Sequence, residues 1–72
     1  MKANLNDAIY TTLRDSYLIA VRDMALYPSD HPAHHAAEWR AASASNTAFA
    51  VLGREAAEAL REEGLREWER MT

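Results

Sequence analysis

The scarcity of helix-breaking residues constrains this chain more than any other feature. Its 72 residues include two prolines, Pro28 and Pro32, and two glycines, Gly53 and Gly64. Proline and glycine are the residues that most often end helices and strands. Most of the chain is therefore free to be helical, and the two neighbouring prolines mark the clearest turn.

Apolar residues recur every three or four positions before this turn, which is the spacing of an amphipathic helix. They are Leu5, Ile9, Leu13, Tyr17, Ala20, Met24 and Tyr27. A residue that precedes a proline avoids the α-helical region, so this helix should end near Tyr27. We predict a first helix over about residues 5–26.

A second helix should begin beside Pro32, because proline suits the first helical position, where its missing N–H would have no partner. His31 then occupies the N-cap. Alanine is the strongest helix former, and eleven of the fifteen alanines lie in residues 33–59. Gly64 suits a C-terminal Schellman motif in which Leu60 contacts Leu65.

We therefore favour one long helix over about residues 32–63, followed by a short C-terminal helical tail. The alternative is a break at Gly53, which would give a bundle of three helices.

The favoured arrangement is an all-α antiparallel hairpin, in one helical domain that spans residues 1–72. Its helices would be about 33 and 46 Å long, so the segment with Leu60, Leu65 and Trp68 would overhang. The apolar run 17–21 should also be buried on more than one side. The chain has no cysteine and hence no disulfide, and domains this small often need added support.

We therefore expect a homodimer to complete the hairpin. Its predicted core combines the apolar face of the first helix with an alanine face of the second: Leu13, Tyr17, Ala20, Met24, Ala41, Ala44 and Ala48.

Charge and motifs exclude several classes of function. A net charge of −3 argues against nucleic-acid binding, and no apolar run is long enough to span a membrane. The N-terminal segment lacks the apolar region of a signal peptide, so we expect a cytoplasmic protein. No glycine-flanked serine or glycine-rich phosphate loop is present. We expect neither an enzyme nor a bound cofactor.

Aromatic residues offer the best candidates for a binding surface, because they are enriched among the residues that dominate protein interfaces. These candidates are Tyr10, Tyr27, Trp39, Phe49 and Trp68. The sequence thus favours a small protein-binding module, a homodimeric regulator or inhibitor of a partner protein of the kind that phages and plasmids encode.

Two alternatives remain open at this level. One is a DNA-binding transcriptional regulator, with a basic patch formed by Arg14, Arg22, Arg40 and Arg54. The other is a metal-binding protein, because some residues near the start of the second helix are three or four positions apart and share a helix face. They are His31, His34, His35 and Glu38. We expect no physiological metal site, since the usual metalloprotease and di-iron patterns are missing.

Overall fold

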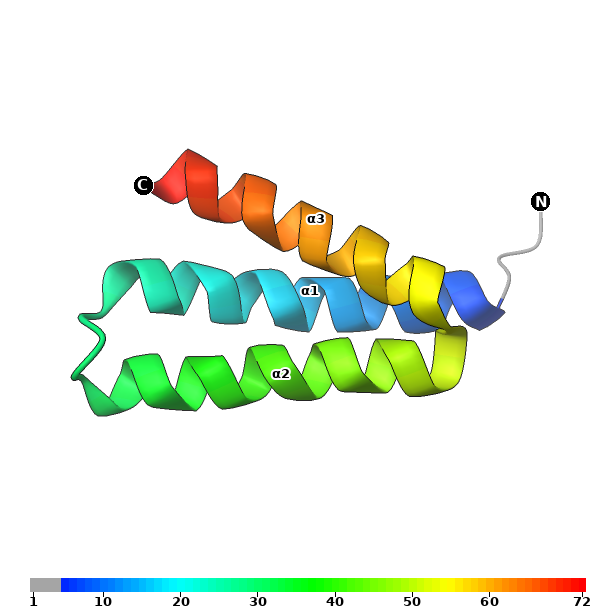
Figure 1. Ribbon diagram of the computed structural model, residues 1–72, viewed down its shortest axis with the longest axis horizontal. Coiled ribbons are helices and arrows are strands. Elements are labelled where there is room, and N and C mark those ends of the chain that lie inside the picture. The colour runs from blue at the N-terminus through cyan, green and yellow to red at the C-terminus, as the bar shows by residue number, and fades with distance from the viewer. Residues whose placement is uncertain (1–4) are drawn as a thin grey trace.

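The computed structural model describes residues 5–72, so the first residues of the N-terminal segment considered above lie outside the described part. It contains three α-helices: α1 (Leu5–Leu26), α2 (Pro32–Leu52) and α3 (Arg54–Met71). In Figure 1, α1 and α2 run antiparallel beside each other, and α3 returns along α1 from the far end of α2. Each helix packs against the other two. The all-helical prediction is confirmed.

The prediction for the first helix and for the start of the second is also confirmed. Helix α1 has the expected bounds, and α2 begins at Pro32 with His31 as its N-cap. The Ala33 N–H donates a hydrogen bond to His31 Nδ1 over 3.0 Å. This bond satisfies one of the N–H groups that a helix start leaves without a partner.

The predicted long helix over residues 32–63 is wrong, because the chain bends at Gly53. Its φ of 98° is the one positive φ among residues 5–72, and such a conformation favours glycine. The Gly53 N–H donates to the carbonyls of Ala48 and Phe49, which ends α2, and its carbonyl accepts from the Ala57 N–H, which begins α3. The three-helix alternative is therefore the observed one.

Gly64 is not the predicted helix stop but lies inside α3, and the expected short tail is the second half of that helix. A Cβ atom at Gly64 would overlap Cε2 of Tyr17. The missing side chain thus lets α3 approach the Tyr17 ring of α1 closely. Gly64 is therefore a packing contact between α1 and α3, and it does not end a helix.

The residues predicted for a dimer core lie in the core of a single chain. Between α1 and α2, the buried residues Ala20, Ala37 and Ala41 form one cluster, and Tyr17 and Met24 pack against it. Small side chains let two helix axes approach closely.

A second cluster lies where all three helices meet. It contains Ala48, Ala57 and Leu60, and Tyr10, Leu13 and Tyr17 pack against it. Ala44, the remaining residue of the predicted dimer core, is also buried.

The overhang that led us to expect a dimer does not exist. Because α3 folds back, Leu60 is fully buried and Ala57 is covered as well. Within the run 17–21, Ala20 and Val21 are buried while Ile19 is half exposed. A single chain thus covers Leu60, Ala20 and Val21, whereas Ile19, Leu65 and Trp68 stay 50%, 58% and 38% exposed.

Candidate protein-binding groove

A groove of about 420 Å³ lies between the three helices. Figure 1 shows α3 diverging from α1 toward its C-terminal end. The lining of the groove comes from all three helices: Tyr17, Val21 and Met24 of α1, His34 of α2, and Arg61, Gly64, Leu65 and Trp68 of α3.

Helical spacing explains why one side of α3 lines the groove. Arg61, Leu65 and Trp68 follow each other at steps of four and three residues, so they share one helix face. Leu65 is 58% exposed and Trp68 is 38% exposed. Arg61 is also exposed, and its Nε atom donates to the carbonyl of Ala57 in its own helix.

His34 fastens the opposite wall of the groove to α1. Its Nδ1 atom lies 3.1 Å from the Met24 carbonyl oxygen and 3.0 Å from that of Tyr27. Because a carbonyl only accepts hydrogen bonds, Nδ1 must carry the proton. The imidazole thereby satisfies carbonyl groups at the end of α1 that have no partner within the helix. We infer that the role of His34 is to hold α1 and α2 together.

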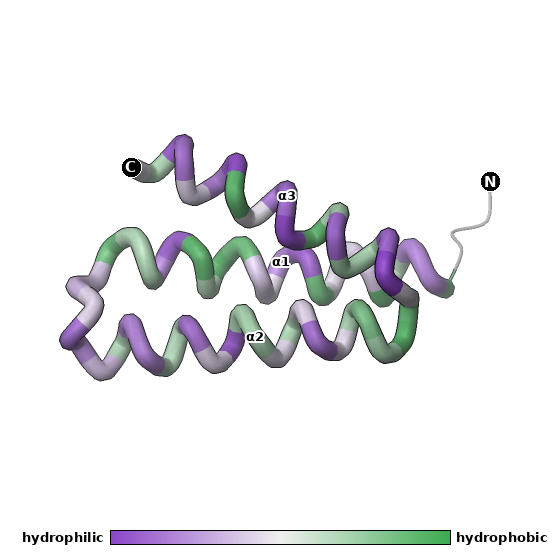
Figure 2. Tube along the Cα trace, in the orientation of Figure 1, coloured by the Kyte–Doolittle hydropathy of each residue, from purple (hydrophilic) through white to green (hydrophobic). Residues whose placement is uncertain are grey.

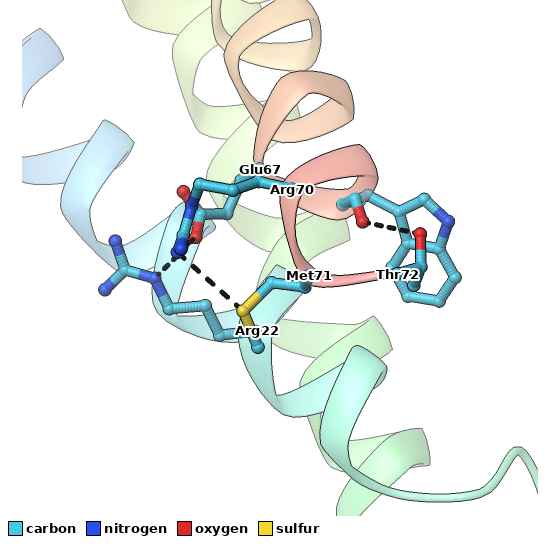
Figure 3. Close-up of polar contacts among 6 residues, drawn as sticks. Arg22, Glu67, Arg70, Met71 and Thr72 are labelled. Carbon is cyan, nitrogen blue, oxygen red and sulfur yellow. Dashed lines mark hydrogen bonds and ion pairs between the residues drawn. The ribbon is translucent and has the colours of Figure 1, made fainter.

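An ion-pair cluster attaches the end of α3 to α1. Arg22 Nε lies 3.1 Å from Oε1 of Glu67, and Arg70 also donates to that carboxylate. Figure 3 shows both guanidinium groups at Glu67. The hydrogen bond from Arg70, followed by the one from Arg22, lowers the pKa of Glu67 below its ordinary value.

Tyr10 links α1 to the middle of α3. Its hydroxyl donates a hydrogen bond to the carboxylate of Glu63. Burial of the phenol, and then the hydrogen bond to Glu63, raises the pKa of Tyr10 to about 12. Tyr10 therefore serves contacts within the chain in this structure.

The five aromatic residues predicted to bind a partner do not form one surface, and of these five Trp68 alone lines the groove. Tyr27 lies at the turn between α1 and α2 and stacks on His31, with ring centroids 4.9 Å apart. Trp39 is 79% exposed and lines a separate hollow of about 300 Å³ on α2. Phe49 is half exposed near the other end of that helix.

The sequence analysis assigned none of five groove residues to partner binding or to the dimer core: Val21, His34, Arg61, Gly64 and Leu65. The spacing of Arg61, Leu65 and Trp68 is visible in the sequence. However, this spacing identifies a groove only once the bend at Gly53 has brought α3 back onto α1.

The structure gives the two alternative sites little support. Within residues 5–72, no group of three or more His, Cys, Asp or Glu side chains could hold a metal ion. Three of the four arginines proposed for a basic patch are paired with carboxylates: Arg14 with Asp15, Arg22 with Glu67, and Arg40 with Asp23.

Comparison of the chain with known protein families, with curated proteins and with solved structures finds no match. None of the described helices combines the length and the apolar character that crossing a membrane requires.

Proposed function

We propose that this chain is a small helical protein-binding module and that the groove between its three helices receives the partner. The observation that carries the proposal is the apolar groove with Leu65 and Trp68 exposed on one wall. Tryptophan is among the residues that contribute most to binding energy when a partner covers them.

The polar groups of the groove favour a protein partner over a small molecule. Small-molecule sites place a few polar groups so that they converge on the ligand. Here the Nδ1 atom of His34 bonds to carbonyls of α1, and one donor of Arg61, its Nε–H, bonds to its own helix. An apolar helix face needs no such convergent groups, and helices commonly bind by laying an apolar stripe into a groove.

Charges beside the groove indicate the chemistry of this helix. Three exposed glutamates share the helical face of Leu65 on α3: Glu58, Glu62 and Glu69. None of them takes part in the ion pairs found among the described residues. Complementary charges across an interface speed up and select the correct encounter. We therefore propose that the partner helix carries lysine or arginine beside its apolar stripe.

A protein that binds a partner and catalyses no reaction fits the role of a regulator or inhibitor, of the kind that phages and plasmids encode. We also propose that the chain acts as a homodimer in the cytoplasm. Its lack of cysteine fits a reducing compartment.

Two designed peptides test the groove. Both are amphipathic helices with the same leucine stripe, flanked by lysines in one and by glutamates in the other. Fluorescence polarisation should show that the lysine peptide binds at least about tenfold more tightly. Trp68→Ala should weaken this binding about tenfold or more. Trp39→Ala is the matched control and should leave it unchanged. Equal binding of both peptides, or full binding by Trp68→Ala, would refute the proposal.

A further inference from the structure

The exposed side of α2 carries no charge over more than three turns. Residues 41–53 contain no Asp, Glu, Lys or Arg. Besides Phe49, the solvent side of this stretch consists of three small or apolar residues and three uncharged polar ones, all of them exposed: Ala42, Ala50, Val51, Ser43, Asn46 and Thr47. A surface helix normally carries charged residues on its exposed face. Figure 2 shows this half of α2 as mostly green or pale.

Two large aromatic side chains lie at the ends of this uncharged face. Trp39 is 79% exposed and Phe49 is 51% exposed. They are ten residues apart, which is about 15 Å along the helix. The small residues Ala42 and Asn46 lie between them at helical spacing. The middle of this face is thus recessed, and a large aromatic side chain projects at each end.

We infer that a second copy of this chain covers the face, with the two α2 helices packed antiparallel. An antiparallel pair centred near Ala44 places Trp39 of each chain opposite Phe49 of the second copy. A hollow of about 300 Å³ beside Trp39, lined also by His35, Glu38 and Ala42, receives that phenyl ring. The small residues between the rings let the helix axes approach closely.

Charge selects this face for contact between two copies of the chain. Two chains of net charge −3 repel each other over most of their surfaces. The repulsion is weakest where an uncharged face meets itself. Pairs of identical chains most often associate through such a self-complementary patch around a twofold axis.

The buried area is sufficient for a specific contact. An aromatic side chain presents about 150–250 Å², and Trp39 is 79% exposed and Phe49 51% exposed, so two copies of each can bury on the order of 500 Å². With the small residues between them, the total reaches about 1,000 Å², the lower bound for a biological interface. One chain exposes 5097 Å², and a tenth of that from each copy gives the same total.

This inference names the surface of the proposed homodimer and does not depend on the groove. Sedimentation equilibrium of the wild-type chain should show a dimer at micromolar concentration. Trp39→Ala and Phe49→Ala should each weaken it by about tenfold or more. Trp68→Ala, in the groove, is the matched control and should leave the dimer intact.

Charged variants test whether the face meets itself. Asn46 is exposed, so Asn46→Glu and Asn46→Lys should fold normally, as circular dichroism would show. Each should be monomeric alone, because like charges then meet across the twofold axis. An equal mixture of the two should recover a dimer.

Because the chain has no cysteine, a single introduced cysteine can test how the two copies are arranged in the dimer. Ser43→Cys lies close to the expected twofold axis and should form a disulfide-linked dimer on mild oxidation. Thr11→Cys, on the exposed side of α1, should not do so at the same concentration. A wild-type chain that stays monomeric would overturn the homodimer itself. A wild-type dimer that resists the substitutions at Trp39, Phe49 and Asn46 would overturn only the choice of face.

Discussion

At the scale of the residue, Gly64 and Tyr17 form the contact on which the position of α3 depends. Gly64→Ala should lower the free energy of unfolding by about 1–3 kcal/mol, because the new Cβ would overlap Cε2 of Tyr17. This loss is expected even though alanine is favoured over glycine in a helix by about 1 kcal/mol. Urea denaturation measures the change.

A double-mutant cycle isolates the reason for this loss. In a Tyr17→Ala background the ring is gone, so Gly64→Ala should be neutral or stabilising. An equal loss in both backgrounds would show that the ring of Tyr17 is not what requires glycine at this position.

The phenol of Tyr10 should make stability depend on alkaline pH. Its pKa is about 12 in the folded chain against an ordinary value of 10.0. Between these values the unfolded chain has released the proton and the folded chain has kept it. The contribution of the protonated Tyr10 to the free energy of unfolding is therefore complete below pH 10, and it is lost as pH rises toward 12. Burial also raises the pKa of Tyr17, which acts in the same direction.

Urea midpoints at about pH 8 and about pH 11 would check this dependence. Tyr10→Phe should show a smaller loss of stability at the higher pH than the wild-type chain. A loss of the same size in both proteins would assign the alkaline sensitivity to other groups.

At the scale of the element, Gly53 decides whether α2 and α3 are two helices or one. Its φ of 98° and ψ of 178° lie in a region that only glycine adopts readily, and other residues there cost about 1–3 kcal/mol. A Cβ atom at this position meets nothing within 4 Å. Gly53→Ala therefore strains the backbone without creating a clash and favours a straight helix.

Small-angle X-ray scattering should detect this change. A helix over residues 32–71 is about 60 Å long, against a longest extent of 43 Å and a radius of gyration of 12.6 Å in the bent chain. Gly53→Ala should increase the radius of gyration. D-alanine at position 53 prefers positive φ and should keep the compact form. An L-alanine variant as compact as the wild type would show that the bend does not need glycine.

At the scale of the whole molecule, stability and association should be linked. The core consists mainly of alanine, and Leu60 is its one large side chain that is fully buried in the described part. Such a core contributes little apolar area, and domains of this size have a few kcal/mol of stability at most. Binding of a second copy then adds a measurable share to the total.

The melting temperature of the wild-type chain should therefore rise with protein concentration, as differential scanning calorimetry over a hundredfold range would show. Asn46→Glu should melt at one temperature across the same range, because it lacks the dimer contact. A wild-type melting temperature that does not vary with concentration would argue against the proposed dimer.

Local signals were sufficient for the first half of the fold. The end of α1, the N-cap at His31 and the start of α2 at Pro32 follow from the conformational limits that proline imposes on itself and on its neighbours. The start of α1 follows from the helical spacing of its apolar residues. The alanine-rich face of α2 was also recognised as a packing surface, although it packs against α1 of the same chain. These features depend on residues close together in sequence, and the sequence alone determined them.

The choice between the two glycines was decided only by tertiary structure. Either glycine is able to end a helix, and the Schellman pattern even favoured Gly64. Carrying a helix through Gly53 costs only about 1 kcal/mol relative to alanine, so local preference left the bend open. Bending there buries Ala57 and Leu60 and places Gly64 against Tyr17, which lies 47 residues earlier. The groove exists because of that distant contact, and no local pattern in the sequence contains it.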